Sequence, residues 1–390
     1  MLSALRAAAA VPRTFPATAV AMQARSASSG AQALKYENLV ESTTTSPGTL
    51  PDPTTLAFGK QFADHMLVCD WSKEEGWAAP VIEPYGDFSL SPSALVLHYG
   101  LECFEGMKAF RGVDDRVRLF RPQRNITRLL KSSQRLTLPS FDGDAFLKLL
   151  THLVKKDAAW VPAGRGYSLY IRPTHIATQP ILGVGATEQS RLFVINSPVG
   201  AYYATGFKPV RLLADPQFVR AWPGGMGDTK CGGNYAPTIL PQQHAAERGC
   251  QQMLWLFGED EKVTEVGTMN LFMHWKNDDG VEELITAPLD GTILEGVTRQ
   301  SIIDLANQWG EFQVSEKYFT MGQLTRALKE GRVYEMFGSG TAATVSPVGE
   351  ILYREETLSI PLELETSGKL SKRFMDELFA IQFCAWTSDD

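Results

Sequence analysis

The sequence predicts a mixed α/β fold (α/β with α+β character) built as two domains that join near residues 200–209. Three observations lead to this prediction. The length of 390 residues suits one large or two ordinary domains. Strand-like and helix-like segments alternate along the chain, and a Gly- and aromatic-rich stretch, SPVGAYYATGFKP, lies at 197–209. We therefore expect a small α/β domain over 58–200, an interdomain loop over 201–209 and a large domain over 210–390.

Composition excludes several classes of protein. Hydrophobic residues make up 44% of the chain, which excludes an intrinsically disordered protein. The net charge of −7, without a long basic block, argues against binding to nucleic acid or anionic membranes. No apolar run approaches the ~18 residues of a membrane span, so membrane insertion is not expected. The five cysteines contain no CxxC pair and the six histidines no HExxH motif, so we expect neither a disulfide framework nor a metal site.

The first 34 residues differ in composition from the rest. They contain Arg6, Arg13 and Arg25, many Ala and Ser residues, and no Asp, Glu or Lys. This composition is typical of a cleaved organelle transit peptide, here a mitochondrial one that directs the protein to the matrix. The alternatives are a chloroplast address and a disordered Ala-rich tail. Residues 35–57 are polar and are expected to form a loop or linker.

Hydrophobic periodicity predicts the elements of the first domain. Runs rich in β-branched and aromatic residues predict strands at Val117–Phe120, Tyr167–Ile171 and Leu192–Ile195. The apolar spacing in Asp144–Val154 predicts an amphipathic helix.

The second domain is expected to hold strands at Val210–Leu213, Met253–Phe257, Leu271–Trp275 and Val333–Phe337. Helical patterns cover Ala236–Arg248, Thr298–Trp309 and Gly322–Lys329. Pro241 falls inside the first of these, so that helix should start late or kink.

Lys230 is the first candidate functional residue. It lies in the Gly-dense segment RAWPGGMGDTKCGGNYAPT, residues 220–238, where glycines let the backbone approach a ligand closely. Such a lysine could form a Schiff base if its pKa is lowered. The segment does not match the Walker A pattern, and the alternative is a surface turn with a solvated lysine.

A carboxylate and two anion-binding loops accompany this lysine. Glu265 in VTEVGTMNLF lies beside an apolar strand, where burial would demand a positive partner; the alternative is a glutamate on a solvent-exposed strand edge. Residues 337–345, FGSGTAATV, match the GxGxxA pattern of dinucleotide-binding loops, but Pro347 argues against the helix that should follow. We therefore predict a Gly-rich turn that offers N–H groups to an anion. Thr298 is expected to be the N-cap of the following helix, whose N-terminus could bind phosphate or be a plain cap. Together these groups suit pyridoxal 5′-phosphate.

From about Phe58 to the C-terminus, the chain resembles branched-chain amino-acid aminotransferases of the mitochondrial type, which are fold-type IV pyridoxal-phosphate enzymes. The resemblance rests on FGKQFADHMLVCDW, LHYGLECFEGMKAFRG, LYIRPT, KCGGNYAPT, VTEVGTMN and FGSGTA, in that order. It implies a two-domain fold with the cofactor at the domain interface, and a homodimer. It also implies reversible transfer of the amino group of L-leucine, L-isoleucine or L-valine to 2-oxoglutarate.

The resemblance assigns roles to individual residues. Lys230 would be the catalytic lysine that bonds the cofactor, and Glu265 would face the ring nitrogen. The other implied cofactor-binding residues are Arg128, Tyr235, Val297, Thr298 and Thr341. Taken alone, NITRLL around Arg128 would be a helix with one exposed arginine.

The implied substrate pocket is aromatic, with polar groups for the carboxylates. Tyr170 with Thr341 and Ala342 would hold the α-carboxylate, and Tyr99 with Arg172 would meet the side-chain carboxylate of glutamate. Val184 would come from the partner subunit. The remaining implied lining residues are Phe58, Phe104, Tyr202 and Thr268.

These residues leave three hypotheses of function. The tyrosine-rich pocket favours the branched-chain transaminase over a lyase of the aminodeoxychorismate type or a D-amino-acid aminotransferase. A catalytically silent homologue is disfavoured because Lys230 and Glu265 are present. Mammalian mitochondrial relatives carry a CxxC pair just after GSGTA, but this chain has Ala343 and Ser346 there, so a thiol switch at that turn is not expected.

Overall fold

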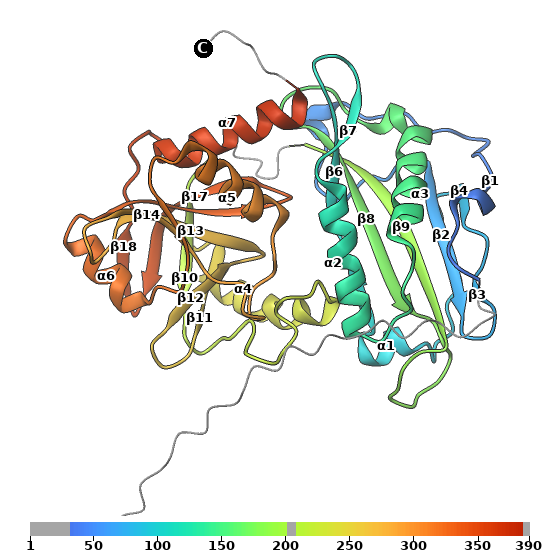
Figure 1. Cartoon of the computed structure of the whole chain (residues 1–390), viewed down its shortest axis with the longest axis horizontal. Helices are drawn as coiled ribbons and strands as arrows, with labels where there is room; N and C mark the ends of the chain where they lie inside the picture. Colours follow the sequence, from blue (N-terminus) through green and yellow to red (C-terminus); the bar gives the residue numbers. More distant parts are fainter. Residues whose placement is uncertain (1–31, 201–207, 385–390) are drawn as a thin grey trace, which may run out of the picture.

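A computed structural model describes residues 32–200 and 208–384. The predicted transit peptide, apart from its last residues, and most of the predicted interdomain loop lie outside the described residues. The described chain forms two lobes side by side, each with its own sheet (Figure 1). Within those residues, no helix combines the length and the apolar character needed to cross a membrane.

The first lobe contains a nine-stranded sheet in the order β1-β4-β2-β9-β8-β6-β7, with β3 on β2 and β5 on β8. Its strands are β1 (Val40–Glu41), β2 (His65–Ser72), β3 (Gly76–Trp77), β4 (Val81–Pro84), β5 (Glu102–Phe104), β6 (Met107–Arg111), β7 (Val117–Leu119), β8 (Ser168–Ala177) and β9 (Gln189–Val199). Its helices are η1 (Tyr36–Asn38), η2 (Pro53–Thr55), α1 (Leu95–Tyr99), α2 (Pro122–Arg135), α3 (Gly143–Lys156) and η3 (Ala158–Trp160).

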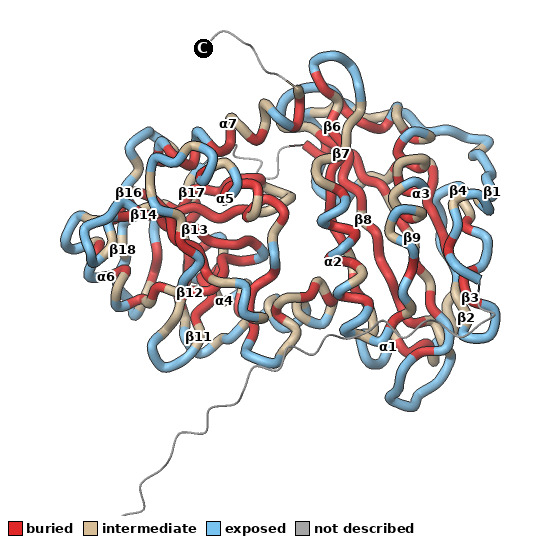
Figure 2. Tube along the Cα trace, viewed as in Figure 1, coloured by how far each residue is buried: buried red, intermediate tan, exposed pale blue. Residues whose placement is uncertain are grey.

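The long strand β8 has two faces with different roles. Leu169 and Ile171 join a buried core with Leu129 of α2 and Leu149 of α3. Because side chains alternate along a strand, Tyr170 and Arg172 point to the opposite face. Figure 2 shows the buried strands behind these helices. The sheet thus uses one face for stability and leaves the other for a site.

The second lobe contains strands in the order β12-β11-β10-β17-β16-β13-β14-β15, with β18 on β17. Its strands are β10 (Val210–Ala214), β11 (Gln252–Phe257), β12 (Lys262–Val266), β13 (Met269–Lys276), β14 (Glu282–Thr286), β15 (Gln313–Glu316), β16 (Val333–Gly340), β17 (Thr344–Tyr353) and β18 (Glu356–Ser359). Because β12 also pairs with β13, six of these strands close into a ring. The helices are η4 (Gly232–Asn234), η5 (Ala236–Thr238), α4 (Ile239–Glu247), α5 (Val297–Trp309), α6 (Met321–Lys329) and α7 (Lys369–Phe383).

All the strands and helices predicted above are present, with shifted ends. Of the late start or kink predicted from Pro241, the structure shows the late start: α4 begins at Ile239, so the proline falls in the first turn, where its missing N–H costs nothing. The N-cap predicted at Thr298 is wrong. Gly296 is the N-cap of α5, and Thr298 lies inside the first turn and is buried.

Residues 35–57 are more structured than their polar composition suggests. Strand β1 pairs in parallel with β4, and Leu34, just before the segment, is buried in the first core. The segment is therefore attached to the first sheet. Its polar side chains are on the outside of a folded lobe.

Candidate active site

A cavity of about 240 Å³ lies where the two lobes meet. The first lobe contributes the side chains of Phe58, Phe104, Arg128, Tyr170 and Arg172 to its lining. The second lobe contributes a larger set, namely Lys230, Tyr235, Glu265, Thr268, Val297, Thr298, Thr341 and Ala342. Residues that were predicted from separate motifs are thus brought together around one space.

Two hydrogen bonds hold the backbone of Lys230 against the first lobe. Its backbone N–H donates to Ser132 Oγ at 2.9 Å, and its carbonyl oxygen accepts from the N–H of Phe104 at 3.0 Å. Its Nζ donates to the Tyr235 hydroxyl at 2.8 Å and lies 4.7 Å from the centre of the Phe104 ring. The loop therefore fixes the lysine against the first lobe and aims its amine into the cavity. The alternative interpretation, a surface turn with a solvated lysine, is therefore wrong.

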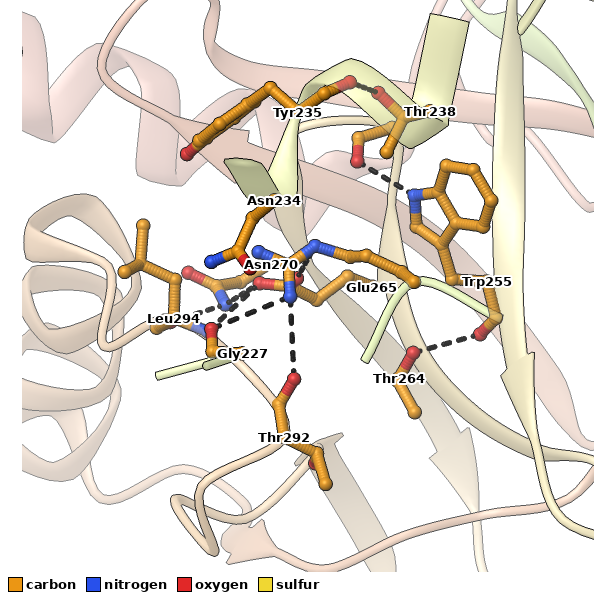
Figure 3. A network of polar contacts seen from close by, with 12 residues as sticks. Gly227, Asn234, Tyr235, Thr238, Trp255, Thr264, Glu265, Asn270, Thr292 and Leu294 are labelled. Atoms are coloured by element: carbon orange, nitrogen blue, oxygen red, sulfur yellow. Dashed lines mark hydrogen bonds and ion pairs between the residues drawn. The ribbon is translucent and has the colours of Figure 1, made fainter. Parts of the chain in front are cut away.

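Glu265 is a buried carboxylate with an incomplete set of donors. Its Oε1 accepts from Asn270 Nδ2 at 3.0 Å and from the N–H of Leu294 at 3.2 Å (Figure 3). Its Oε2 forms an ion pair with Arg220 Nε at 2.7 Å, but no hydrogen bond of good geometry reaches this oxygen within the described chain. Burial raises the pKa of Glu265, and the nearby charge of Arg220 opposes this shift. Oε2 can accept a further N–H donor from the cavity.

Arg128 is buried, so the interpretation as an exposed helix arginine is wrong. Its Nε and Nη2 donate to the two carboxylate oxygens of Glu105 at 2.6 and 2.9 Å, and its Nη1 donates to the carbonyl of Glu295 at 2.7 Å. Beside it, α5 begins at Val297 after a glycine cap that has no side-chain hydrogen bond. A helix N-terminus with an adjacent arginine is suited to bind a phosphate.

The turn between β16 and β17 lines the same cavity. Gly340 and Thr344 pair across the strands, so Thr341, Ala342 and residue 343 form a three-residue turn, as predicted. Lys108 Nζ donates to the carbonyl of Ala342 at 2.9 Å, and burial lowers the pKa of Lys108 to about 8. This bond from the first lobe orients the turn, whose N–H groups can face an anion.

The substrate end of the cavity is aromatic and has one guanidinium group. The Phe58 and Tyr170 rings pack edge to face at 4.8 Å. Arg172 donates from Nη2 to the Tyr170 hydroxyl at 2.9 Å, and its guanidinium carbon lies 4.5 Å from the centre of the Phe104 ring. A Cβ at Gly106 would lie 2.0 Å from the same hydroxyl, so glycine is needed there. The arrangement suits an apolar side chain and tolerates a carboxylate.

Three of the predicted substrate residues are not among those that line the cavity. The Tyr99 hydroxyl donates to the carbonyl of Leu182, and the side chain of Val184 is 80% exposed. Tyr202 lies outside the described residues. In the described ranges, no cluster of three or more His, Cys, Asp or Glu residues could hold a metal ion.

The residues around this cavity fit an anionic, aromatic cofactor. The unfilled Glu265 Oε2 suits a protonated ring nitrogen, and Arg128 with the N-terminus of α5 suits a phosphate. Lys230 supplies an amine in the lining of the same cavity. This combination is what pyridoxal phosphate requires of a protein.

Comparison with known proteins agrees with this geometry. Residues 102–351 match the model of the amino-transferase class IV family. A branched-chain-amino-acid aminotransferase of Monosiga brevicollis is 61% identical over 385 residues, which cover 99% of this chain and 97% of that protein. The chain belongs to the branched-chain-amino-acid aminotransferase family.

Other members of the family carry both cytosolic and mitochondrial names. The cytosolic aminotransferase of Ovis aries is 53% identical, with 92% of this chain and 93% of that protein covered. The mitochondrial aminotransferase of Bos taurus is 54% identical, with 87% of each chain covered. The solved structure of the Escherichia coli aminotransferase shares the fold with a TM-score of 0.66 at 24% identity and covers 82% of this chain and 96% of that chain. Another branched-chain aminotransferase, solved with pyridoxamine 5′-phosphate, has a TM-score of 0.64 at 25% identity, over 82% of this chain and 95% of that chain.

Four residues that contact the predicted site residues were not predicted from the sequence. Glu105, Arg220, Asn270 and Lys108 all contact a predicted site residue, yet none was singled out. Arg220 is the first residue of the Gly-dense segment that contains Lys230, and this proximity in sequence could have pointed to a role in the site. The others lie in ordinary strand or turn sequences, and only their spatial neighbours give them a role.

Proposed function

We propose that this aminotransferase exchanges the α-amino group of L-leucine, L-isoleucine or L-valine with 2-oxoglutarate, reversibly, with pyridoxal 5′-phosphate bound at Lys230. The observation that carries the proposal is one cavity that is lined by Lys230 and has an aromatic end with the guanidinium group of Arg172. The names of the relatives at 52–61% identity support the same substrate class.

The cofactor would be held by groups described above. Arg128, Thr341 and the N–H groups of Val297 and Thr298 would bind its phosphate, and Tyr235 its phenolic oxygen. Glu265 would accept a hydrogen bond from the ring nitrogen and keep that nitrogen protonated. When bound, pyridoxal phosphate supplies an aldehyde for the amino group and an electron sink for the substrate α-carbon.

Side chains of the protein would accept and hold the proton of the substrate α-carbon. As a free amine, Lys230 Nζ would accept this proton and hold it inside the cavity. Its hydrogen bond to the Tyr235 hydroxyl gives the amine a fixed position and a partner for exchange. Phe104 lies over Nζ and limits the access of water on that side.

Substrate recognition follows from the two ends of the pocket. A branched side chain would rest among Phe58, Tyr170 and Phe104, and Thr268 would border it. The side-chain carboxylate of glutamate would enter the same place and meet Arg172, whose Nε is buried without a hydrogen-bond partner in the described chain. Tyr170 and the turn at Thr341 and Ala342 would hold the α-carboxylate common to all substrates.

We further propose a homodimer in which Tyr99 and Val184 reach the partner's site. Supporting this, α1 and the loop after β8 expose a cluster of apolar side chains next to these two residues, a kind of surface that marks an interface. The cluster consists of Leu97, Ile181 and Leu182. Sedimentation equilibrium of the purified protein tests the dimer; a monomer at micromolar concentration would contradict it.

The central experiment measures substrate specificity. Purified protein with added cofactor is assayed with each branched-chain amino acid and 2-oxoglutarate, and glutamate formation is followed by a coupled dehydrogenase. Arg172→Met should raise the KM for 2-oxoglutarate at least 10-fold and leave the KM for leucine within about threefold, since a charge-assisted bond contributes roughly 1.5–3 kcal/mol. Turnover of D-alanine or pyruvate release from aminodeoxychorismate, without leucine turnover, would favour the competing activities.

The mitochondrial matrix is the proposed location. It is supported by the acid-free, Arg- and Ser-containing composition of residues 1–34. A fusion of these residues to a fluorescent reporter should enter mitochondria, and replacement of Arg6, Arg13 and Arg25 by Glu should abolish import. Cytosolic fluorescence of the unmodified fusion would reject the proposal.

A further inference from the structure

Two cysteines distant in the sequence lie opposite each other beside the active-site lysine. Cys103 in β5 and Cys231 just after Lys230 form an isolated antiparallel bridge. Both side chains are fully buried and belong to the same hydrophobic core. All five cysteines are within the described residues, and none of the other three is paired with a cysteine across strands.

The hydrogen bonding defines the geometry of this pair. The N–H of Phe104 donates to the carbonyl of Lys230 at 3.0 Å, so the bond joins the residue after Cys103 to the residue before Cys231. In an antiparallel bridge, this pattern makes the two cysteines a non-hydrogen-bonded pair, with Cα atoms about 4.5 Å apart and both side chains on one face. Disulfides span Cα separations of roughly 4.4–6.8 Å, most often about 5.5–6 Å. The two thiols are within bonding reach, at the short end of that range.

The surroundings of the two sulfurs differ. Cys103 Sγ contacts Ser133 Oγ at 3.4 Å, while Cys231 Sγ contacts Thr229 Oγ1 at 3.2 Å. Burial raises the pKa of Cys103 to about 12. Burial also raises the pKa of Cys231, but the Thr229 hydroxyl and the charge of Arg135 oppose that shift. The Ser133 hydroxyl likewise opposes the shift at Cys103, but only Cys231 has a nearby cation that favours its thiolate, so we take Cys231 as the attacking thiol; both thiols should react slowly.

We propose that Cys103 and Cys231 are a redox modification site, a dithiol that hydroperoxides convert to a disulfide next to Lys230. The Cys231 thiolate attacks a peroxide oxygen: an S–O bond forms, the O–O bond breaks, and the departing hydroxide takes up the proton lost by Cys231. The Cys103 sulfur then attacks the Cys231 sulfur. The S–S bond forms, the S–O bond breaks, and hydroxide leaves with the Cys103 proton. Two thiols lose two electrons, and one hydrogen peroxide becomes two waters.

The disulfide would disturb the site through its immediate neighbours. Opening the bridge from about 4.5 Å toward the usual disulfide separation moves the strands apart by roughly 1 Å. The bond between Phe104 and Lys230 would then stretch beyond hydrogen-bond range, and Lys230 would shift relative to the Phe104 ring. A misplacement of about 1 Å can cost an enzyme about 100-fold in rate. We expect the oxidised protein to lose at least about 10-fold in kcat and to regain it with dithiothreitol.

Peptide mapping tests the site directly and does not depend on the proposed substrates. The full-length protein is treated with hydrogen peroxide for minutes to hours, denatured, blocked with iodoacetamide and digested with trypsin without reduction. The tryptic peptides 74–108 and 231–248 contain one cysteine each. They should appear as one linked species that dithiothreitol separates, and its yield should rise in step with the loss of activity. Unlinked peptides, or Cys231 recovered as sulfinic acid, would overturn the proposal.

Serine variants provide the controls, each normalised to its own untreated activity. Cys103→Ser and Cys231→Ser should both prevent the link and any inactivation that dithiothreitol reverses. Cys384→Ser, which removes the least buried cysteine, should form the link and lose activity as the parent does. If Cys103→Ser folds poorly, Cys103→Ala serves the same purpose. Inactivation of a Cys103 variant at the parent rate, with reversal by dithiothreitol, would place the switch elsewhere.

Discussion

The ion pair between Arg220 and Glu265 makes a quantitative prediction about stability and pH. Its atoms are 2.7 Å apart, and the two side chains are 7% and 3% exposed. Replacing Arg220 by Met leaves Glu265 buried without its charge partner, a change that costs about 3–5 kcal/mol for a carboxylate that stays ionised. The carboxyl can escape this cost by taking a proton. From its ordinary pKa of 4.5, protonation at pH 7 costs about 2.5 units at 1.36 kcal/mol each, or about 3.4 kcal/mol.

The loss therefore depends on pH in a definite direction. The folded-state pKa of Glu265 lies above its unfolded value, so the folded protein binds more protons between the two, and stability falls as the pH rises through that window. Arg220→Met should raise the pKa of Glu265 in the folded protein further, so the pH range over which stability falls extends to higher pH. The destabilisation should be about 3 kcal/mol at pH 7 and fall to about 1.4 kcal/mol at pH 5.5, where protonation costs one unit.

Urea unfolding of the cofactor-free protein, followed by tryptophan fluorescence at pH 5.5, 7 and 8, measures these values. The double variant Arg220→Met/Glu265→Gln removes the buried charge, so it should be at least about 2 kcal/mol more stable than Arg220→Met at pH 8 and show little pH dependence. Its kcat should remain low, because a neutral amide cannot hold the cofactor nitrogen protonated. An equal loss at pH 5.5 and 8, or a double variant as unstable as the single one, would refute the reasoning.

Three further predictions follow from individual contacts. Lys230→Ala should abolish leucine transamination and the visible absorption of the bound cofactor, and a variant with full activity would remove the cofactor assignment. Gly368→Ala would place a Cβ about 2.1 Å from the buried carboxylate of Glu335, which caps α7. The free energy of unfolding in urea should therefore fall by about 1–3 kcal/mol. Gly322→Ala is the control, because its Cβ would meet the nearest atom at 3.7 Å, and it should leave the free energy of unfolding unchanged. Glu105→Ala should remove the carboxylate that positions Arg128 and raise the dissociation constant of pyridoxal phosphate at least 10-fold by equilibrium dialysis; unchanged cofactor affinity would contradict this prediction.

Local sequence patterns determined the parts of this protein in which neighbours along the chain carry the information. The apolar spacing of residues 144–154 predicted helix α3, and Pro241 predicted that α4 would start late or kink, of which the late start is observed. The Gly-dense loop marked Lys230, and the polar residue in an apolar strand marked Glu265. In each case the signal and the consequence lie within one turn or one strand.

Tertiary structure alone decided how these parts meet. The pairing of Arg128 with Glu105, of Glu265 with Arg220, and of Cys103 with Cys231 joins segments that are separate in the sequence. A sequence pattern records which face of a strand or helix is apolar, but it does not record which other segment packs there. Whether Arg128 is an exposed helix residue or a buried one depends on that packing, because Glu105 of the first lobe and the Glu295 carbonyl of the second both take up its N–H groups. The site exists because two sheets, each stable through its own core, leave their polar faces toward one cavity.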